Sequence, residues 1–466
     1  MAGVPTPTLP RIPRWISLRN SLRFAYNPIA TLDQYVAEYG PTFEFYLGGM
    51  VKGILTTDPG LAQHVLQKEH RKWRKSPIQT ERMGYFLGNG LLTSDGDYWL
   101  RQRRLIQPGF HRKRLAGLTA IMNQEVDDFL DRRFEPALAA GQPIDMSPMM
   151  MELAFRVVAK SLFTTALTEE DLTLLADTVT VVQSFIARTF RQPYLIPWFR
   201  FSGQYREHKE LSDRFEGVIL KYIQGRRSSG ERNDDLLQML LEARYEDTGE
   251  GMTDRQLVEE SAILFVAGHE TTANALSWAW FLLGQHPEVV ERLRREHEAV
   301  LGGREPAFED LPKLEYTQQV IDEAMRLFPP AWITDRLCVE DDQYGELPLP
   351  KGSRVVAYIW GIHRRPGLWD EPGVFRPERF SRERRKEYHP FAYMPFGGGP
   401  RLCIGNNFAL MEMQLVLVKM LRRYELEWNP GFEPELQPLI TLRPRNGVLM
   451  RVRRKGEQTG VEGLNG

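Results

Sequence analysis

The sequence predicts a mainly α fold, of the α+β kind, in which a large helical region with a long central helix is joined to a small β-rich region. Three observations lead to this prediction. Apolar residues recur at three- and four-residue intervals from about Tyr98 to Tyr316, a period typical of packed helices. Within this region one apolar stretch has the length of a very long helix. Short segments typical of strands occur near both ends of the chain.

The composition fits a globular protein and argues against some partners. The 60 basic and 61 acidic residues nearly cancel, so no overall field attracts nucleic acid, and we expect no nucleic-acid partner. The chain has only two cysteines, which is a poor disulfide framework for 466 residues. The low cysteine content fits a reducing compartment, and we therefore expect the protein to be cytoplasmic.

The chain divides into three parts. Residues 1–28 are expected to form an extended proline-rich lead-in, because four prolines occur among the first thirteen residues and exclude the apolar helix of a signal peptide or transmembrane anchor. Residues 29–454 are expected to form a single domain. Residues 455–466 are polar and glycine-rich, which is typical of a flexible tail.

Two local patterns fix elements in the first two thirds of the chain. Phe43-Glu-Phe-Tyr-Leu47 and Gly53-Ile-Leu-Thr-Thr57, separated by glycines, predict a hairpin. The capping box Thr253-Asp-Arg-Gln256 predicts the start of the long helix, which runs to about Leu283. Its apolar part also fits a membrane span, but His269 and Glu270 near its centre make that interpretation unfavourable.

The segment Phe396-Gly-Gly-Gly-Pro-Arg-Leu-Cys-Ile-Gly405 indicates a reactive cysteine loop. Cys403 lies just before a predicted amphipathic helix from Asn407 to about Tyr424. A segment typical of strands follows from Pro438 to Arg453. The free amides and partial positive charge of a helix N-terminus favour a thiolate, which can act as a nucleophile or as a metal ligand. The alternative for a lone cysteine is a small buried apolar side chain.

The pattern Phe-x-x-Gly-x-Arg-x-Cys-x-Gly resembles the signature of the cytochrome P450 family, and the resemblance extends from about Asn27 to Arg453. It implies the cytochrome P450 fold, with haem b (iron protoporphyrin IX) between the helical and β-rich regions. Cys403 would be the axial ligand of the iron, and Arg401 would pair with a haem propionate. Phe396, Gly397 and Gly405 would contact the cofactor from the same loop.

A second motif, Ala267-Gly-His-Glu-Thr-Thr272, lies inside the predicted long helix. Ala267 and Thr271 share one face, and a helical glycine beside a threonine hydroxyl permits a local opening. The resemblance implies that Thr271 hydrogen-bonds bound O₂, that Glu270 delivers protons and that Ala267 contacts the haem. The alternative is a tolerated glycine beside a solvated glutamate. The resemblance implies that this motif is shared with the branch of the family that is rich in fatty-acid hydroxylases.

Weaker motifs gain meaning from the resemblance. Trp99 and Arg103 share a helix face and, with Arg336, are implied to bind the haem propionates. Glu323 and Arg326, three apart on a helix, are implied to form a buried structural charge network with the distant Arg379. The substrate pocket is predicted from apolar segments that match the substrate-contacting regions of the family, namely Phe86, Leu87, Phe265, Ala331, Trp332, Ile333, Leu439 and Ile440.

The resemblance implies a haem-thiolate monooxygenase that inserts one oxygen atom of O₂ into an apolar small molecule such as a fatty acid, an alkane or a terpenoid-like compound. No reductase-like segment follows Arg453, so we expect electrons from NAD(P)H through a ferredoxin or flavodoxin with its reductase. The basic run from Arg101 to Arg114 is either their docking surface or a solvated face. The aromatic segment 190–201 is either a lid over the pocket or part of the core.

Two alternatives stay open. A peroxygenase or peroxide isomerase has the same fold, but such relatives usually lose the acid–threonine pair that this chain keeps as Glu270 and Thr271. A haem-binding sensor or carrier without turnover needs no such pair.

Overall fold

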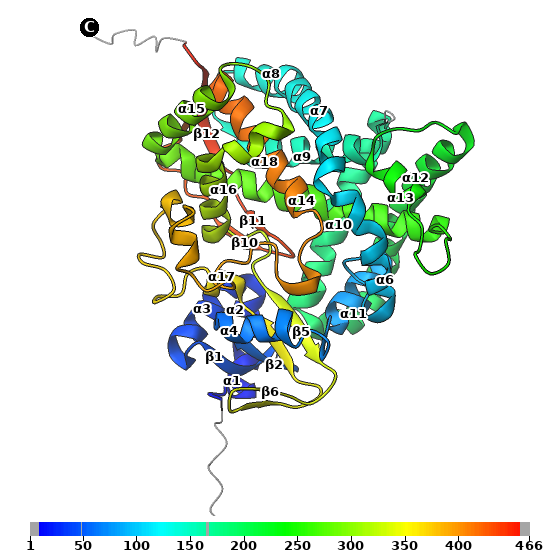
Figure 1. Ribbon diagram of the computed structural model, residues 1–466. Helices are drawn as coiled ribbons and strands as arrows, with labels where there is room; N and C mark the ends of the chain where they lie inside the picture. Colours follow the sequence, from blue (N-terminus) through cyan, green and yellow to red (C-terminus); the bar gives the residue numbers. More distant parts are fainter. Residues whose placement is uncertain (1–8, 48, 165–166, 457–466) are drawn as a thin grey trace, which may run out of the picture.

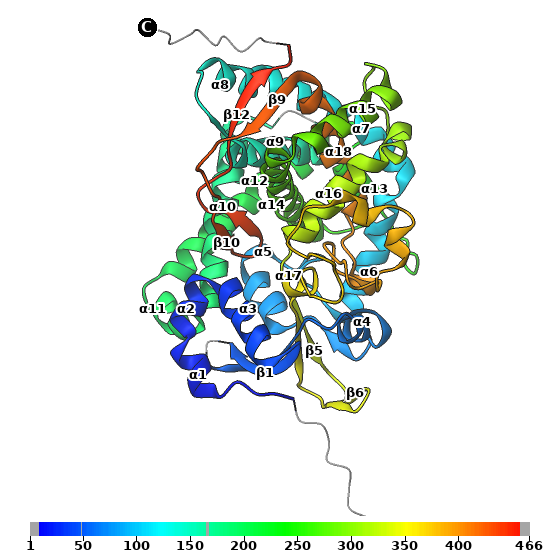
Figure 2. The same cartoon turned by 90° about the vertical axis from the view of Figure 1, so that its left-hand side faces the viewer.

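The computed structural model describes residues 9–47, 49–164 and 167–456. Helices dominate, and the strands lie mainly at the bottom of Figures 1 and 2, with others near the middle and the top. The helices of the large helical region are α6 (Gly96–Ile106), α7 (Arg112–Phe129), α8 (Glu135–Ala139), α9 (Met146–Leu162), α10 (Glu169–Arg191), α11 (Ile196–Phe201), α12 (Gln204–Ser229), α13 (Leu236–Glu242), α14 (Asp254–Gln285), α15 (Pro287–Leu301), α16 (Glu315–Leu327) and α18 (Asn406–Arg423).

The long helix α14 organises this region. It begins after the predicted capping box, in which Thr253 and Gln256 bond reciprocally, and it has 32 residues. It contacts α9, α12, α16 and α18, so most of its length is buried on all sides. This environment explains why its sequence is apolar without a clear polar face. Within the described ranges, no helix combines the length and apolarity that a membrane span needs.

The β-rich region contains a five-stranded sheet whose strands come from distant parts of the chain. Its order is β1-β2-β8-β5-β3, and β2 and β8 are parallel, whereas the other pairs are antiparallel. The predicted hairpin is formed by β1 and β2, with Phe43 opposite Leu55. The strands of this sheet are β1 (Thr42–Leu47), β2 (Val51–Thr56), β3 (Trp73–Arg74), β5 (Thr334–Cys338) and β8 (Arg354–Ala357).

Three smaller sheets complete the strands. The strand β12 lies between β4 and β9, and two hairpins pair β6 with β7 and β10 with β11. Their strands are β4 (Ile144–Asp145), β6 (Asp342–Tyr344), β7 (Leu347–Leu349), β9 (Tyr424–Trp428), β10 (Leu436–Pro438), β11 (Leu442–Pro444) and β12 (Leu449–Arg454). The remaining helices are short: α1 (Arg14–Arg19), α2 (Ser21–Tyr26), α3 (Pro28–Tyr39), α4 (Pro59–Gln63), α17 (Ile359–Ile362) and α5 (Gly84–Leu87), the last of which contacts α12 and α14.

The expectation of an extended lead-in up to residue 28 is wrong for most of the described part of that segment. The helices α1 and α2 occupy residues 14–26, and Ile12 is fully buried in the same apolar cluster as Ile29. Pro13 stands directly before the first residue of α1, where a proline does not interrupt helical hydrogen bonds. Pro13, the last proline before Pro28, therefore lies outside both α1 and α2. The predicted flexible tail lies outside the described residues from residue 457 onward.

Candidate active site

A cavity with a volume of about 540 Å³ lies between α14, the cysteine loop and the five-stranded sheet. From α14 it is lined by residues spaced three and four apart, including Ala267, Gly268 and Thr271. Across the cavity lies the loop 396–405, which contains Cys403. Its size and its largely apolar walls are those of a site for a small molecule or an organic cofactor.

The cysteine loop is held in shape by its own backbone. The Cys403 N–H donates to the Phe396 carbonyl over 3.0 Å, and the Gly397 N–H donates to the Met394 carbonyl over 3.0 Å. Gly399 has a φ of +67°, and a Cβ there would lie 2.0 Å from the backbone oxygen of Leu66. Only glycine fits this position, because both the conformation and the close approach exclude a side chain. The loop therefore presents the Cys403 side chain to the cavity.

The thiol of Cys403 is reachable from the cavity although it lies deep in the fold. Burial raises the pKa of Cys403 above its ordinary value, and this outweighs the Gly405 N–H and the Arg103 guanidinium, which both lower that pKa. The sequence argument from the helix N-terminus thus identified a real effect, because the Gly405 N–H lowers the pKa of Cys403. Burial, however, has the larger effect on that pKa. A bound metal ion reverses the balance, because a coordinating thiol is deprotonated outright.

Cationic side chains gather at one edge of the cavity. Arg336 and Arg401 line it together with Lys75, Trp99 and Arg103. Burial, followed by Arg401, lowers the pKa of Arg336 to about 10, and burial, followed by Arg336, lowers the pKa of Lys75 to about 7. These shifts show that the cations are close enough to repel one another. An anionic group in the cavity would relieve that repulsion.

The residues present fit a haem at this site. Arg401 Nη2 is 2.8 Å from Asp95 Oδ1, and Arg103 Nη1 donates to the Leu402 carbonyl over 2.9 Å. The Nε atoms of Arg336 and Arg401, however, are buried and have no hydrogen-bond partner among the described residues. Two orphaned guanidinium donors beside an apolar cavity match the two carboxylates of a porphyrin, and Cys403 offers a thiolate for its iron.

The helix α14 brings Thr271 to the cavity but turns Glu270 away from it. Thr271 Oγ1 donates to the Ala267 carbonyl over 2.8 Å, and α14 continues through this point as a regular helix. Glu270 is buried, and Arg443 Nε on β11 lies 2.6 Å from its Oε1, which also accepts a hydrogen bond from Thr441. One residue along a helix is a rotation of about 100°, which accounts for the difference. Its role in proton delivery stays a prediction.

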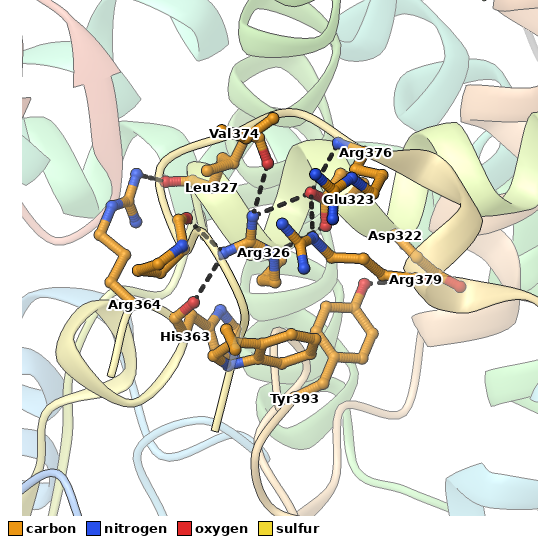
Figure 3. A network of polar contacts seen from close by, with 12 residues as sticks. Asp322, Glu323, Arg326, Leu327, His363, Arg364, Val374, Arg376, Arg379 and Tyr393 are labelled. Carbon is orange, nitrogen blue, oxygen red and sulfur yellow. Dashed lines mark hydrogen bonds and ion pairs between the residues drawn. The ribbon is translucent and has the colours of Figure 1, made fainter. Parts of the chain in front are cut away.

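Glu323, Arg326 and Arg379 lie together in the fold (Figure 3). Arg326 Nε is 2.7 Å from Glu323 Oε2, and Arg379 Nε is 3.3 Å from Glu323 Oε1. All three side chains are almost completely buried. The network joins α16 to the backbone of residues 371–376, because Arg326 also donates to the Pro372 carbonyl and Glu323 accepts from the Arg376 N–H.

A chain of hydrogen bonds connects this network to the cysteine loop. Arg326 Nη1 donates to the His363 carbonyl over 2.8 Å, and His363 Nε2 accepts from the Met394 N–H over 2.9 Å. The Met394 carbonyl in turn accepts from Gly397, at the start of the loop. The network therefore supports the loop without itself lining the cavity.

Two buried histidines each contribute stability that is lost in mild acid. Burial, with Arg326 and Arg364, lowers the pKa of His363 to about 3, and burial lowers that of His297 to about 4. In the unfolded chain each imidazole takes up a proton near its ordinary pKa of 6.5, whereas the native protein takes it up only in stronger acid. The contribution of each histidine to stability is therefore lost as the pH falls from about 6.5 to about 4.5, by about 1.4 kcal/mol per pH unit, whereas the buried Glu260 and Glu412, whose pKa values are raised by burial, contribute in the opposite direction.

Urea midpoints measured across this pH range check the prediction. His297, which contacts Thr317 Oγ1 at 2.9 Å, supplies the control, because His297→Gln removes one titrating group that does not line the cavity. The variant should lose less stability than the wild type over this range, by about 1.4 kcal/mol per pH unit. An unchanged dependence would contradict the assignment.

The predicted substrate pocket is only partly brought together. Ala331, Trp332, Ile333, Leu439 and Ile440 line the cavity, whereas Phe86, Leu87 and Phe265 do not. Phe265 packs against Phe155 and Phe215 in the core, and Phe86 packs against Phe185 and Tyr205. For Phe265 the reason is helical phase, because it is two positions from Ala267 and such residues do not share a face.

The aromatic segment 190–201 and the basic run 101–114, whose roles the sequence leaves open, each contain residues in different environments. In the aromatic segment, Phe190 lines the cavity and Phe199 is fully buried, whereas Trp198 and Phe201 are exposed. The basic run is partly neutralised, since Arg101 pairs with Asp247 at 2.9 Å and Arg114 with Asp234 at 3.6 Å. The side chains of Arg112 and Lys113 lie outside the described residues.

Sequence reasoning missed four site residues: Lys75, Asp95, Thr441 and Arg443. The partners of Asp95 and Arg443 lie 306 and 173 residues away in the chain, so no local pattern announces these contacts. Lys75 carried one usable signal, a lysine shortly before an apolar segment and close in sequence to the Trp99 motif.

The chain is similar to several bacterial enzymes. It is 35% identical over 426 residues to cyclooctatin synthase of Streptomyces melanosporofaciens, covering 91% of each chain. It is 34% identical to cyclooctat-9-en-7-ol 5-monooxygenase of the same organism, covering 84% of each. It is 32% identical to pentalenene oxygenase of Streptomyces avermitilis, covering 92% of each.

A profile of the family described as Cytochrome P450 matches residues 7–451, nearly the whole chain. This match agrees with the cavity, its thiol and its cationic edge. The chain therefore belongs to the cytochrome P450 family, the haem-thiolate monooxygenases that draw electrons from NAD(P)H through partner proteins and insert one oxygen atom of O₂ into an apolar substrate.

Proposed function

We propose that this cytochrome P450 hydroxylates a terpenoid-like molecule. The observation that carries the proposal is the largely apolar lining of the cavity, in which Ala331, Trp332, Ile333, Leu439 and Ile440 offer apolar contact to a substrate in the same cavity as Thr271. The names of two relatives support it, since one is a cyclooctat-9-en-7-ol 5-monooxygenase and another a pentalenene oxygenase.

The proposal assigns roles to the residues of the chain. Cys403 ligates the haem iron, while Arg336, Arg401, Arg103 and Trp99 hold the propionates, with Lys75 beside them. When bound, the haem supplies an iron whose thiolate ligand donates electron density that favours O–O cleavage. Thr271 offers its hydroxyl to the cavity while its proton is held by the Ala267 carbonyl.

Glu270 supports proton movement indirectly in this proposal. Its carboxylate is anchored by Arg443 on β11 and has one oxygen, Oε2, without a hydrogen-bond partner among the described residues. A rotation of this side chain would bring the free oxygen toward Thr271, its neighbour on α14. Glu270 then exchanges protons with the Thr271 side of the cavity.

We propose the cytoplasm as the site of action and a ferredoxin or flavodoxin with its reductase as the electron source. The two cysteines support a reducing compartment, because neither is in a disulfide in the described structure. The surface around Arg104, which is exposed on α6 near the cysteine loop, offers positive charge to an acidic electron carrier.

The test is a reconstituted turnover assay with purified protein, NADPH, surrogate ferredoxin and reductase, and a panel of cyclic terpenes, fatty acids and alkanes. Binding is followed by the spin-state change of the haem, and product by mass spectrometry. Hydroxylated terpenes formed only with the redox proteins support the proposal. A preference for fatty acids or alkanes contradicts the substrate class, and turnover with hydrogen peroxide alone favours a peroxygenase.

Thr271→Ala is expected to reduce hydroxylated product per NADPH by about 10- to 100-fold, because the variant lacks the hydroxyl that directs protons in the cavity. Oxygen consumption continues and hydrogen peroxide accumulates. Thr180→Ala on α10 is the matched control, since Thr180 makes the same bond to a carbonyl four residues earlier but is exposed. Equal coupling in the Thr271 variant and the wild type would contradict this role.

A further inference from the structure

We propose that Glu260 is a positioning residue for the oxidation, because it fixes a loop that forms part of the cavity wall. The loop consists of residues 88–95 (the wall loop), between α5 and α6. Leu91 and Leu92 of this loop line the cavity, whereas Glu260 on α14 is completely buried and does not line it. The Leu91 N–H donates to Glu260 Oε2 over 2.9 Å. Glu260 therefore acts on the substrate through the backbone of Leu91.

The backbone of the wall loop lies directly on α14. A Cβ at Gly90 would lie 2.8 Å from Ile263 Cγ1 and 3.0 Å from the Glu259 carbonyl oxygen. Gly88 has a φ of +75°, a conformation that side chains rarely adopt. Thr93 Oγ1 donates to the Gly88 carbonyl over 2.6 Å, so the wall loop is closed on itself. The helix α5, which leads into the loop, also contacts α14 (Figure 2). A shift at this contact therefore moves the wall loop as one unit.

A second buried side chain, that of Lys75, binds the same part of the wall loop. Lys75 Nζ donates to the Leu91 carbonyl over 2.6 Å and to the Ser94 carbonyl over 2.9 Å. Lys75 lies between β3 and α5, far from α14 in the sequence. Both polar groups of the Leu91 backbone are therefore held by side chains, the N–H by Glu260 and the carbonyl by Lys75. A backbone fixed in this way also fixes where the Leu91 side chain enters the cavity.

The bond to Leu91 requires an acceptor at position 260 but not a full negative charge. Burial raises the pKa of Glu260 to about 7, although the Leu91 N–H and Lys75 lower that pKa. The second oxygen, Oε1, has no hydrogen-bond partner among the described residues. A glutamine offers an acceptor of the same shape, whereas methionine has a similar length but only a weak acceptor. A buried N–H that loses its acceptor is costly, so methionine should displace the wall loop.

The wall loop borders the face of α14 that carries Thr271. Ile263, Ala267 and Thr271 are spaced four apart, share that face and line the cavity. Leu91 and Leu92 line the same cavity, and the rise along the helix from Ile263 to Thr271 is about 12 Å. A misplacement of about 1 Å between a substrate and a reacting group can change a rate by about 100-fold. A displaced wall loop should therefore change which carbon is oxidised. This effect on oxidation rests on the proposed function, whereas the fixing of the loop does not.

Two iron-binding probes of different size test the assignment on the purified holoprotein. Imidazole and 4-phenylimidazole both bind the haem iron through nitrogen, but only the second has a phenyl ring that reaches the cavity wall. Glu260→Met is expected to weaken the binding of 4-phenylimidazole by about 10-fold, because the wall around the ring is displaced, and to leave the binding of imidazole unchanged. Glu260→Gln should bind both probes like the wild type. Both affinities are measured from the shift of the haem absorption band.

Gly90→Ala tests the same contact without altering Glu260, and it decides the question if Glu260→Met takes up no haem. Its Cβ meets α14, so it should push the wall loop away and weaken 4-phenylimidazole by a similar factor. Gly84→Ala is the matched control, because a Cβ there would lie 3.7 Å from Thr93, an ordinary contact. Glu125→Met controls for the loss of a buried carboxyl group, since Glu125 on α7 is also buried but does not line the cavity. Both controls should bind the two probes like the wild type.

Three results would overturn the inference: unchanged affinity for 4-phenylimidazole in both Glu260→Met and Gly90→Ala, an equal loss of affinity for imidazole, or a loss in Glu260→Gln as large as in Glu260→Met. The effect on oxidation is measured separately, as the ratio of hydroxylated products from the terpenes of the reconstituted assay. This ratio should change in Glu260→Met and return in Glu260→Gln, and an unchanged ratio would overturn the role in oxidation. If the wild type oxidises none of these terpenes, the proposed function fails, while the two probes still decide on Glu260.

Discussion

Replacing Cys403 by serine is expected to abolish monooxygenase activity and the carbon monoxide spectrum typical of thiolate-ligated haem. Cys403 is the one cysteine among the described residues that line the cavity. A serine hydroxyl keeps the size of the side chain but cannot supply the thiolate that donates electron density to the iron. The effect on turnover should exceed that of any other single substitution in the cavity.

The measurements are haem content, the carbon monoxide difference spectrum and product formation in the reconstituted assay. The matched control is Cys338→Ser, because Cys338 is buried in the five-stranded sheet, where its Sγ donates to the Glu340 carbonyl. That variant should keep the thiolate spectrum. Wild-type activity in the Cys403 variant, or a spectrum that changes only in the Cys338 variant, would show that the ligand was wrongly assigned.

Arg326→Leu is expected to destabilise the holoprotein by about 3–5 kcal/mol, because it leaves the buried Glu323 with only the longer ion pair to Arg379 and removes donors from three backbone carbonyls. The hydrogen-bond chain through His363 and Met394 transmits the loss to the cysteine loop. We therefore expect faster release of haem as well as a lower midpoint of urea unfolding.

A pair on the surface provides the comparison. Arg206 and Glu210 are four apart on α12 at 3.8 Å, with side chains that are 84% and 63% exposed. Glu210→Gln should change stability by less than about 1 kcal/mol, since exposed ion pairs contribute little. If Arg326→Leu unfolds at the wild-type midpoint and retains haem equally well, the network is not the support of the loop.

Features governed by neighbouring residues could be predicted from the sequence. The capping box at Thr253 places the start of α14, the glycine-spaced strands give the β1–β2 hairpin, and the cysteine loop carries its own turn residues. Each of these is decided by residues within a few positions of one another. Thr271 and Ala267 also lie on one face, as the period of a helix requires.

Features that depend on tertiary contacts could not be predicted in this way. The pairing of Arg401 with Asp95 and of Glu270 with Arg443 joins residues that only the complete fold brings together. The resemblance predicts Phe265 in the pocket, although its position on α14 directs it to the core. The burial of Cys403 likewise changes its pKa in a direction that the adjacent helix does not indicate.

The order of strands in the five-stranded sheet has a consequence for biosynthesis. The strands β1, β2 and β3 all lie within the first 74 residues and are therefore synthesised early. The second neighbour of β2 in the sheet, however, is β8 at residues 354–357. Contacts of such long sequence separation form slowly, because the chain between them must first be brought to order. Until about three quarters of the polypeptide has been made, the first strands present unpaired backbone and apolar surface, and a nascent chain of this length is the state that most needs a chaperone.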